Sequence, residues 1–283
     1  MKAFEVKDHA PSLLPDGDWK LAWADEFDGT ELDRMKWDYR THIWGKRHYC
    51  FSEDGIIIDG NSNAVFRIFE KEGYICSPHL QTASNWIDSP ANDEAMFGAV
   101  SEGEKPGLVW PIGKFKEPKF LHRYGYYECR CKLQKEKGWW SAFWMQSPMI
   151  GACADAGLSG IEVDIMESFA PGEVSCHVLH YGGYGEDHKS KTAGENRAGV
   201  SLDEYHYFGM LWEPDGYTFF VDGEQDGEKI CDPVSHIPEF LLISTEVNGY
   251  RSSKHAPTEE AKRAAKVGDE FVVDHIRVFD KLN

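Results

Sequence analysis

Residues 160–168 read GIEVDIMES. This stretch places three carboxylates, Glu162, Asp164 and Glu167, among residues that favour β-strands. Ionised groups are costly to bury unless they are paired or take part in chemistry, so the stretch marks a candidate site. Strand alternation directs Glu162 and Asp164 to one face, whereas Glu167 lies five positions beyond Glu162 and has the opposite parity.

A β-bulge at Ile165-Met166 would return Glu167 to the face of the other two carboxylates. Glu162 and Glu167 would then flank Asp164, which is compatible with the roughly 5–5.5 Å carboxyl separation of retaining glycosidases. Glu162 would attack an anomeric carbon and Glu167 would protonate the leaving oxygen, with Asp164 hydrogen-bonded to the nucleophile. A solvated acidic strand or a cation site is the alternative, because acidic residues are common in a chain with a net charge of −18.

Most of the chain around this stretch is predicted to form strands, because segments rich in β-branched and aromatic residues are separated by turns such as Asp28-Gly29 and Asp222-Gly223. The predicted strands are Gly55–Asp59, Ala64–Glu70, Tyr126–Leu133, Trp140–Gln146, Ile161–Glu167, Val174–His180, His206–Glu213, Tyr217–Val221, Phe240–Val247 and Glu270–Phe279. We therefore expect an all-β protein, built as an antiparallel β-sandwich.

Two other segments differ from this pattern. Thr258–Val267 is predicted to be a helix, to which we assign no chemistry. Ser84–Lys119 is polar and has little periodicity, so we expect a loop that shapes a binding cleft, with a disordered insertion as the alternative. Because no repeat or change of composition marks a linker, we expect residues 1–283 to form a single domain with its core at about residues 20–280.

The composition limits the classes of partner. Hydrophobic residues make up 41% and charged residues 28%, as in ordinary globular proteins. Aromatic residues reach 13% with ten Trp, which favours stacking on sugar rings. The net charge of −18 and the pI near 5.0 oppose binding to nucleic acid and to anionic membranes, so we expect neither partner.

The cysteines and the first twenty residues indicate the cellular compartment in which we expect the protein. The seven cysteines are odd in number and form no C-x-x-C pair, which favours reduced structural thiols. The first twenty residues lack the apolar run of a secretory signal. We therefore expect a cytoplasmic monomer, with a secreted protein as the alternative if a leader has been trimmed.

The carboxylate stretch resembles that of glycoside hydrolase family 16, whose members carry an E-x-D-x-x-E or E-x-D-x-E strand in a β-jelly-roll. Further likeness to the family is carried by Arg123–Arg130, Gly138–Met145, His180-Tyr181-Gly182, Leu211–Gly216, Phe220–Gly223 and Val273–Val278. The resemblance implies a concanavalin-like sandwich with a concave glycan-binding cleft. It also implies a retaining endo-hydrolase of β-1,3- or β-1,3-1,4-glucan, with Glu162 as nucleophile and Glu167 as acid/base.

The resemblance also suggests residues that bind the polysaccharide. They are His180, Tyr181, Trp140, Trp144, Trp44, Arg40 and Arg47. Trp140 and Trp144 are evenly spaced and so share a strand face, although core packing is the alternative for both. His180 could instead be a hydrogen-bonded structural residue.

Two stretches depart from the family pattern. Ile43–Tyr49 carries Lys46 and Arg47 where laminarinases have a W-G-N-N-E-like sequence, so these cations could meet an acidic or sulfated sugar or could belong to a solvated loop. Asp155–Gly160 replaces the usual W-P-x-x-G sequence before the nucleophile strand. A hydrolase of agar-, porphyran- or carrageenan-type β-galactan is therefore an alternative, as are a transglycosylase and a non-catalytic glycan-binding module.

Family members often hold a structural calcium between an early acidic residue and one near the C-terminus. Glu26 and Asp274 occupy similar positions, so the resemblance implies a possible calcium site and no cofactor that the reaction requires.

Overall fold

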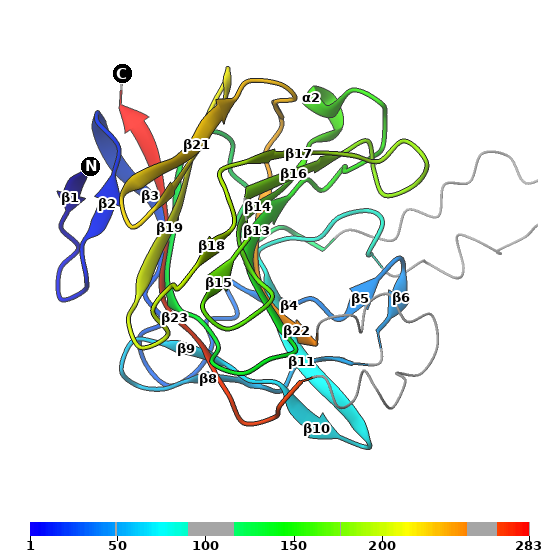
Figure 1. The fold of residues 1–283 in the computed structure, drawn as a ribbon. Coiled ribbons are helices and arrows are strands. Elements are labelled where there is room, and N and C mark those ends of the chain that lie inside the picture. The colour runs from blue at the N-terminus through cyan, green and yellow to red at the C-terminus, as the bar shows by residue number, and fades with distance from the viewer. Residues whose placement is uncertain (49, 90–115, 176, 248–264, 283) are drawn as a thin grey trace, which may run out of the picture.

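Two stacked β-sheets make up most of the structure (Figure 1). The computed structural model describes residues 1–48, 50–89, 116–175, 177–247 and 265–282. Within these residues one sheet has nine strands and the other has eight. All but one of their strand pairs are antiparallel.

The nine-stranded sheet carries the carboxylate stretch near one end. In order, it contains β10 (Phe69–Lys71), β11 (Tyr74–Gln81), β22 (Phe240–Val247), β13 (Trp139–Gln146), β14 (Glu162–Ser168), β16 (His177–Tyr181) and β17 (Lys189–Ala193). Two short strands also pair with β11: β4 (Asp38–Tyr39) antiparallel and β7 (Phe51–Ser52) parallel.

The eight-stranded sheet backs the first. In order, it contains β21 (Glu224–Ile230), β20 (Gly216–Val221), β19 (His206–Glu213), β12 (Gly125–Lys132), β23 (Phe271–Leu282), β9 (Ala64–Phe66) and β8 (Ile56–Ile58), with β3 (Asp18–Asp25) paired to β23. The remaining elements are β1 (Lys2–Phe4) with β2 (Ser12–Leu14), β5 (His42–Ile43) with β6 (Lys46–Arg47), β15 (Glu173–Val174) with β18 (Arg197–Ala198), and the one-turn helix α2 (Ala156–Ser159). No helix in the described residues has the length and apolar character needed to cross a membrane.

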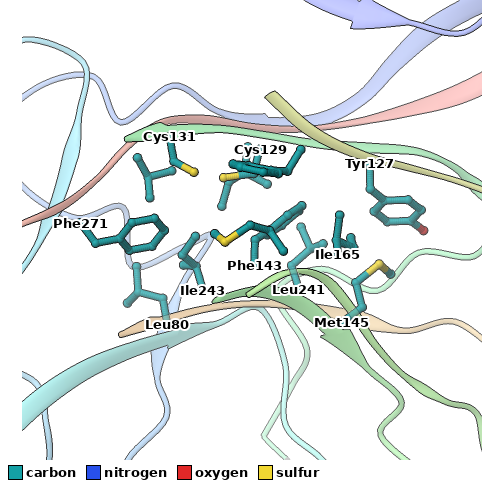
Figure 2. Close-up of a cluster of buried hydrophobic side chains, with 14 of the residues drawn as sticks. Leu80, Tyr127, Cys129, Cys131, Phe143, Met145, Ile165, Leu241, Ile243 and Phe271 are labelled. Carbon is teal, nitrogen blue, oxygen red and sulfur yellow. The ribbon is translucent and has the colours of Figure 1, made fainter. Parts of the chain in front are cut away.

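The main core lies between the two sheets (Figure 2). Tyr127 and Cys129 on β12 face Phe143 and Ile165 on the opposite sheet, and all four are fully buried. Burying each large apolar side chain of this kind stabilises the fold by about 1.5–3 kcal/mol. Val163, Ile165 and Met166 of β14 belong to this core, whereas the three carboxylates of the strand do not.

The all-β sandwich predicted from the sequence is confirmed, and β19 and β22 have the predicted bounds. The predicted strand Ala64–Glu70 is divided, because the chain leaves β23 after Phe66 and pairs with β11 from Phe69. The predicted helix Thr258–Val267 lies largely outside the described residues, as does most of the loop Ser84–Lys119. The six described cysteines form no disulfide with one another.

Candidate active site

A β-bulge lies in β14, where the parity of the carboxylates requires it. Phe143 of β13 pairs with Met166, but the next residue, Trp144, pairs with Asp164, so Ile165 has no partner on β13. This extra residue places Glu167 on the same face of the strand as Glu162. The predicted bulge at Ile165-Met166 is confirmed.

The start of β14 is fixed by contacts outside the strand. Asp155 caps α2 by accepting the N–H of Gly157 at 2.8 Å, and the helix ends at Gly160 with φ +80°. A Cβ at Gly160 would lie 2.1 Å from Cβ of Ser147, so only glycine fits there. The buried carboxyl of Glu239 then accepts the N–H of Ile161 at 2.9 Å. This turn takes the place of the W-P-x-x-G sequence that is missing here.

The three carboxylates line one cavity of about 250 Å³. Its walls are formed by Trp140, Ala142, Trp144, Glu162, Asp164, Glu167, His180, Tyr184, His188 and Ser244. Asp164 and Glu167 are buried, while Glu162 is half-buried and closer to solvent. The arrangement of three carboxylates around a cavity with aromatic walls suits acid/base and nucleophilic chemistry on a sugar.

Trp140 orients Glu167. Its indole Nε1 donates to Oε1 of Glu167 at 2.9 Å. The Trp140 ring lies 5.1 Å from the ring of Phe169, which is partly exposed beside the cavity. Trp140 thus holds one carboxylate oxygen and also presents an aromatic surface.

His180 lies against Asp164. The pair is 3.4 Å apart between Nε2 and Oδ2, and Nδ1 of His180 lies 3.0 Å from Nε2 of His188. Burial lowers the pKa of His180, the Glu162 charge opposes this shift, and His188 adds to it, so neutral imidazole is favoured. Glu162, Asp164 and His180 place ligand atoms within 4.8 Å of one another, and in the described residues they are the sole set of three or more His, Cys, Asp or Glu side chains close enough to share a metal ion.

Glu162 accepts two hydrogen bonds on the same oxygen. Gln146, the last residue of β13, donates from Nε2 to Oε2 of Glu162 at 2.7 Å, and the hydroxyl of Tyr184 also donates to Oε2. Tyr184 as a whole is 36% exposed, but desolvation raises the pKa of its hydroxyl well above its usual value, and the nearby Glu162 charge raises it further. The hydroxyl is therefore protonated and acts as a donor.

A second cavity of about 480 Å³ adjoins the first, and Tyr184 lines both. Its walls include two tryptophans, Trp44 and Trp86. Trp44 is 62% exposed, and its backbone N–H donates to Oδ1 of Asp88 at 3.0 Å. Trp44 thus presents an exposed ring beside a cavity, and its part in substrate binding stays a prediction.

Comparison with known proteins shows which family the chain resembles. Residues 111–230 match Glycosyl hydrolases family 16. Glucan endo-1,3-beta-glucosidase A1 of Niallia circulans is 26% identical over 285 residues, which cover 92% of this chain and 37% of that protein. Beta-glucanase of Rhodothermus marinus is 25% identical over 281 residues, covering 92% of this chain and 85% of that protein. The chain is similar to members of glycosyl hydrolase family 16.

A further relative and a solved structure extend the comparison. Beta-porphyranase E of Zobellia galactanivorans is 25% identical over 264 residues, covering 84% of this chain and 79% of that protein. The catalytic domain of an endo-1,3-beta-glucanase from Thermotoga petrophila matches the structure with a TM-score of 0.61 at 22% identity, covering 95% of this chain and 100% of that one. The structural likeness bears on the fold, and the relatives named here are hydrolases of polysaccharides.

Arg40 lines neither of the two cavities, although the sequence suggested that it binds substrate. It is 4% exposed, and its Nε and Nη2 donate to Oδ2 of Asp88 at 3.1 and 2.6 Å. Its guanidinium also lies 5.2 Å from the ring of Trp144. Arg40 therefore packs against Trp144, which lines the catalytic cavity. Its buried charge is balanced by Asp88, as a buried cation requires.

Tyr181 and Arg47 also lie away from the cavities. Tyr181 follows His180 on β16, so alternation turns it towards the main core, against which it packs. Arg47 is exposed on β6 and lines neither of the two cavities. The side chain of Lys46 lies outside the described residues.

Glu26 and Asp274 each accept hydrogen bonds from an arginine. Both oxygens of Glu26 accept from Arg277, with Nε at 2.8 Å and Nη2 at 2.7 Å. Oδ2 of Asp274 accepts from Nη1 of Arg130 at 2.8 Å. Because each carboxylate already has a cationic partner, the residues do not fit a calcium ion between them, and calcium binding remains a prediction that no observation supports.

Several residues of the site were not predicted from the sequence, among them Gln146, Tyr184, His188 and Trp86. Gln146 has the same parity as Trp140 and Trp144 on β13, so strand alternation was the signal that pointed to it. Tyr184 lies in the glycine-rich turn between β16 and β17, where no periodic pattern indicates which way a side chain points.

Proposed function

We propose that this chain hydrolyses β-1,3- or mixed β-1,3-1,4-glucan at internal linkages, with retention of anomeric configuration. The observation that carries the proposal is the bulged strand β14, which sets Glu162, Asp164 and Glu167 along one cavity. The glucan hydrolases among the relatives support the choice of substrate. They are 26% and 25% identical to this chain, and the chain spans only 37% of the first of them.

The first chemical step breaks the glycosidic bond. A carboxylate oxygen of Glu162 attacks the anomeric carbon while Glu167 gives its proton to the departing glycosidic oxygen. A covalent glycosyl ester of Glu162 results. Trp140 holds Oε1 of Glu167 during this step, and the neutral His180 lies beside Asp164 without adding positive charge.

The second step releases the sugar. Glu167, now ionised, takes a proton from water, and the water oxygen forms its bond to the anomeric carbon as the ester bond to Glu162 breaks. The electron pair of that bond returns to the Glu162 carboxylate. Two inversions at one carbon give net retention.

The shape and charge of the chain favour an internal cut in a neutral polymer. The catalytic cavity is followed by the cavity of Trp44 and Trp86, which offers room for further sugars beyond the cleaved bond. The net charge of −18 would slow the approach of a polyanion.

A sulfated β-galactan is the second candidate substrate. The 25% identity to a β-porphyranase and the basic residues Lys46 and Arg47 favour it. Arg47 is exposed, so it is accessible to a polymer that extends beyond the two cavities.

The proposal is tested on laminarin, lichenan and porphyran, with Glu162→Ser as the inactive control and chromatography to size the products. We expect laminarin to shorten rapidly to a series of oligosaccharides. Cleavage of porphyran alone would favour the galactan, and release of single glucose units alone would exclude internal cleavage.

A further inference from the structure

The two donors on Oε2 of Glu162 form a clamp, which we define as Gln146 and Tyr184. Both hydrogen bonds end on Oε2, and Gln146 Nε2 also donates to the Tyr184 hydroxyl. Gln146 is 1% exposed, so its amide is shielded from water. A carboxylate held at one oxygen by two neighbouring donors has little freedom to rotate.

A buried chain of polar groups fixes the orientation of the Gln146 amide. Asn85 Nδ2 donates to Oε1 of Gln146 and also to Oδ2 of Asp88, the latter at 3.1 Å. Burial would raise the pKa of Asp88, but the Arg40 guanidinium beside it and the N–H of Trp44 hold it below its usual value. The ionised Asp88 thus orients Asn85. Because Gln146 accepts from Asn85 through Oε1, its Nε2 must point to Glu162.

Tyr184 is positioned by a close contact between two loops. A Cβ at Gly151 would lie 2.5 Å from Cα of Gly183, so the turn that carries Tyr184 packs directly on the loop after β13. The Tyr184 and His188 rings stack with centroids 6.2 Å apart, and His188 contacts His180. These contacts hold the hydroxyl over the nucleophile.

We infer that Gln146 and Tyr184 are positioning residues of the hydrolysis, which hold Oε2 of Glu162 so that Oε1 faces the anomeric carbon. This inference rests on the proposed function. The clamp acts chiefly in the second step. When the bond between the anomeric carbon and Oε1 breaks, the electron pair returns to the carboxylate, and two donors already in place stabilise the negative charge. In the first step the carboxylate loses charge, so the donors give less assistance.

Removing either donor of the clamp should slow the second chemical step more than the first. Tyr184→Phe keeps the ring and removes the hydroxyl, and Gln146→Met keeps the length and removes the donor. A hydrogen bond to a charged group corresponds to a rate change of about tenfold to a hundredfold. We expect each variant to lower kcat by such a factor and to lower KM in parallel, so that kcat/KM changes little, because release of the sugar becomes rate-limiting and the glycosyl-enzyme accumulates.

Stopped-flow kinetics with an aryl β-laminaribioside separates the steps. The clamp variants should release a burst of aryl alcohol close to one equivalent of enzyme, followed by slow turnover. Tyr205→Phe and Gln225→Met are matched controls, since Tyr205 donates to Asn63 and Gln225 to Gly227 on the other sheet. Wild-type rates in both clamp variants, or a higher KM with unchanged kcat, would overturn the clamp.

A crystal structure of the double variant Gln146→Met/Tyr184→Phe provides a readout that does not depend on activity. We expect the Glu162 carboxylate to rotate or to occupy two conformations, and an unchanged single conformation would overturn the clamp. Failure of the proposed function is recognised separately, because wild type would then leave all the glucans intact or Glu162→Ser would remain active.

Discussion

Glu162 and Glu167 share a cavity because Ile165, between them, has no partner on β13. A strand without this bulge would direct Glu167 into the core between the sheets, where an ionised carboxylate is costly. The position of this one bulged residue therefore decides whether both glutamates can act on the same glycosidic bond.

Replacing Glu167 should affect substrates according to their leaving groups. In Glu167→Ala no side chain can protonate the departing oxygen, so cleavage of laminarin should fall by a factor of about 10²–10⁴. An activated aryl glycoside needs no such proton, and its first step should be slowed far less. The measurement is kcat/KM on both substrates, and equal losses on the two would contradict the acid role.

Glu239→Gln should change how stability depends on pH. Burial raises the pKa of Glu239 to about 8. The hydrogen bond from Ile161 opposes this rise, and the Glu162 charge adds to it. An unfolded glutamate has a pKa of about 4.3, so between these values the folded chain binds one more proton than the unfolded chain. The contribution of protonated Glu239 to the free energy of unfolding is therefore complete below about pH 4, and it is lost as the pH rises towards 8.

The amide of the Glu239→Gln variant does not titrate, so the variant should gain stability relative to wild type as the pH rises. The slope of this difference is about 1.4 kcal/mol per pH unit at most. Urea unfolding at pH 5, 6, 7 and 8 measures it, with Glu224→Gln on the exposed face of β21 as control. Parallel pH curves for wild type and Glu239→Gln would rule out a shifted Glu239.

Chelation should leave the protein as stable as before. Nη1 of Arg277 donates to the carbonyl of Ala10 and to Oγ of Ser12, both at 2.8 Å, so the guanidinium links the N-terminal segment to Glu26. We expect EDTA to leave Tm unchanged, whereas Arg277→Met should destabilise the fold by about 3–5 kcal/mol because the Glu26 carboxylate loses its cation. A lower Tm in EDTA that calcium restores would show that a calcium site exists.

Substitution of the basic loop discriminates between the two substrates. Lys46→Asn/Arg47→Glu installs the residue types of the laminarinase pattern. If these cations bind sulfate, two contacts of about 1.5–3 kcal/mol each are lost, and kcat/KM on porphyran should fall on the order of a hundredfold. On laminarin we expect kcat/KM to stay within about twofold of wild type. A large loss on laminarin would place the loop in contact with neutral glucan.

The central strands could be predicted from sequence because they are apolar and regular, but the edge strands could not. Lys189–Ala193 and Glu224–Ile230 lie at sheet edges and are largely polar and exposed, so they lack an apolar pattern. Pro78 interrupts β11, where it pairs with the short parallel strand β7. The strand Asp18–Asp25 was missed although Trp19, Leu21 and Trp23 alternate as half-buried strand residues do.

The catalytic carboxylates could be predicted because their spacing, and the bulge it requires, lie within one strand. Arg40 could not be placed, since the partner that buries it, Asp88, is 48 residues away. The clamp depends in the same way on Tyr184, which is 22 residues from Glu162 and reaches it across a turn. Contacts between distant segments follow from the fold and not from a local pattern.

The anomeric configuration of the product formed with azide tests the central claim most directly. Glu162→Ser should lose hydrolysis of laminarin while its circular dichroism spectrum stays unchanged. Azide should restore turnover, because it can occupy the space of the lost carboxylate and attack the anomeric carbon in a single inversion. The account predicts an α-glycosyl azide by proton NMR. A β-glycosyl azide, or hydrolysis at the wild-type rate without azide, would contradict Glu162 as the nucleophile.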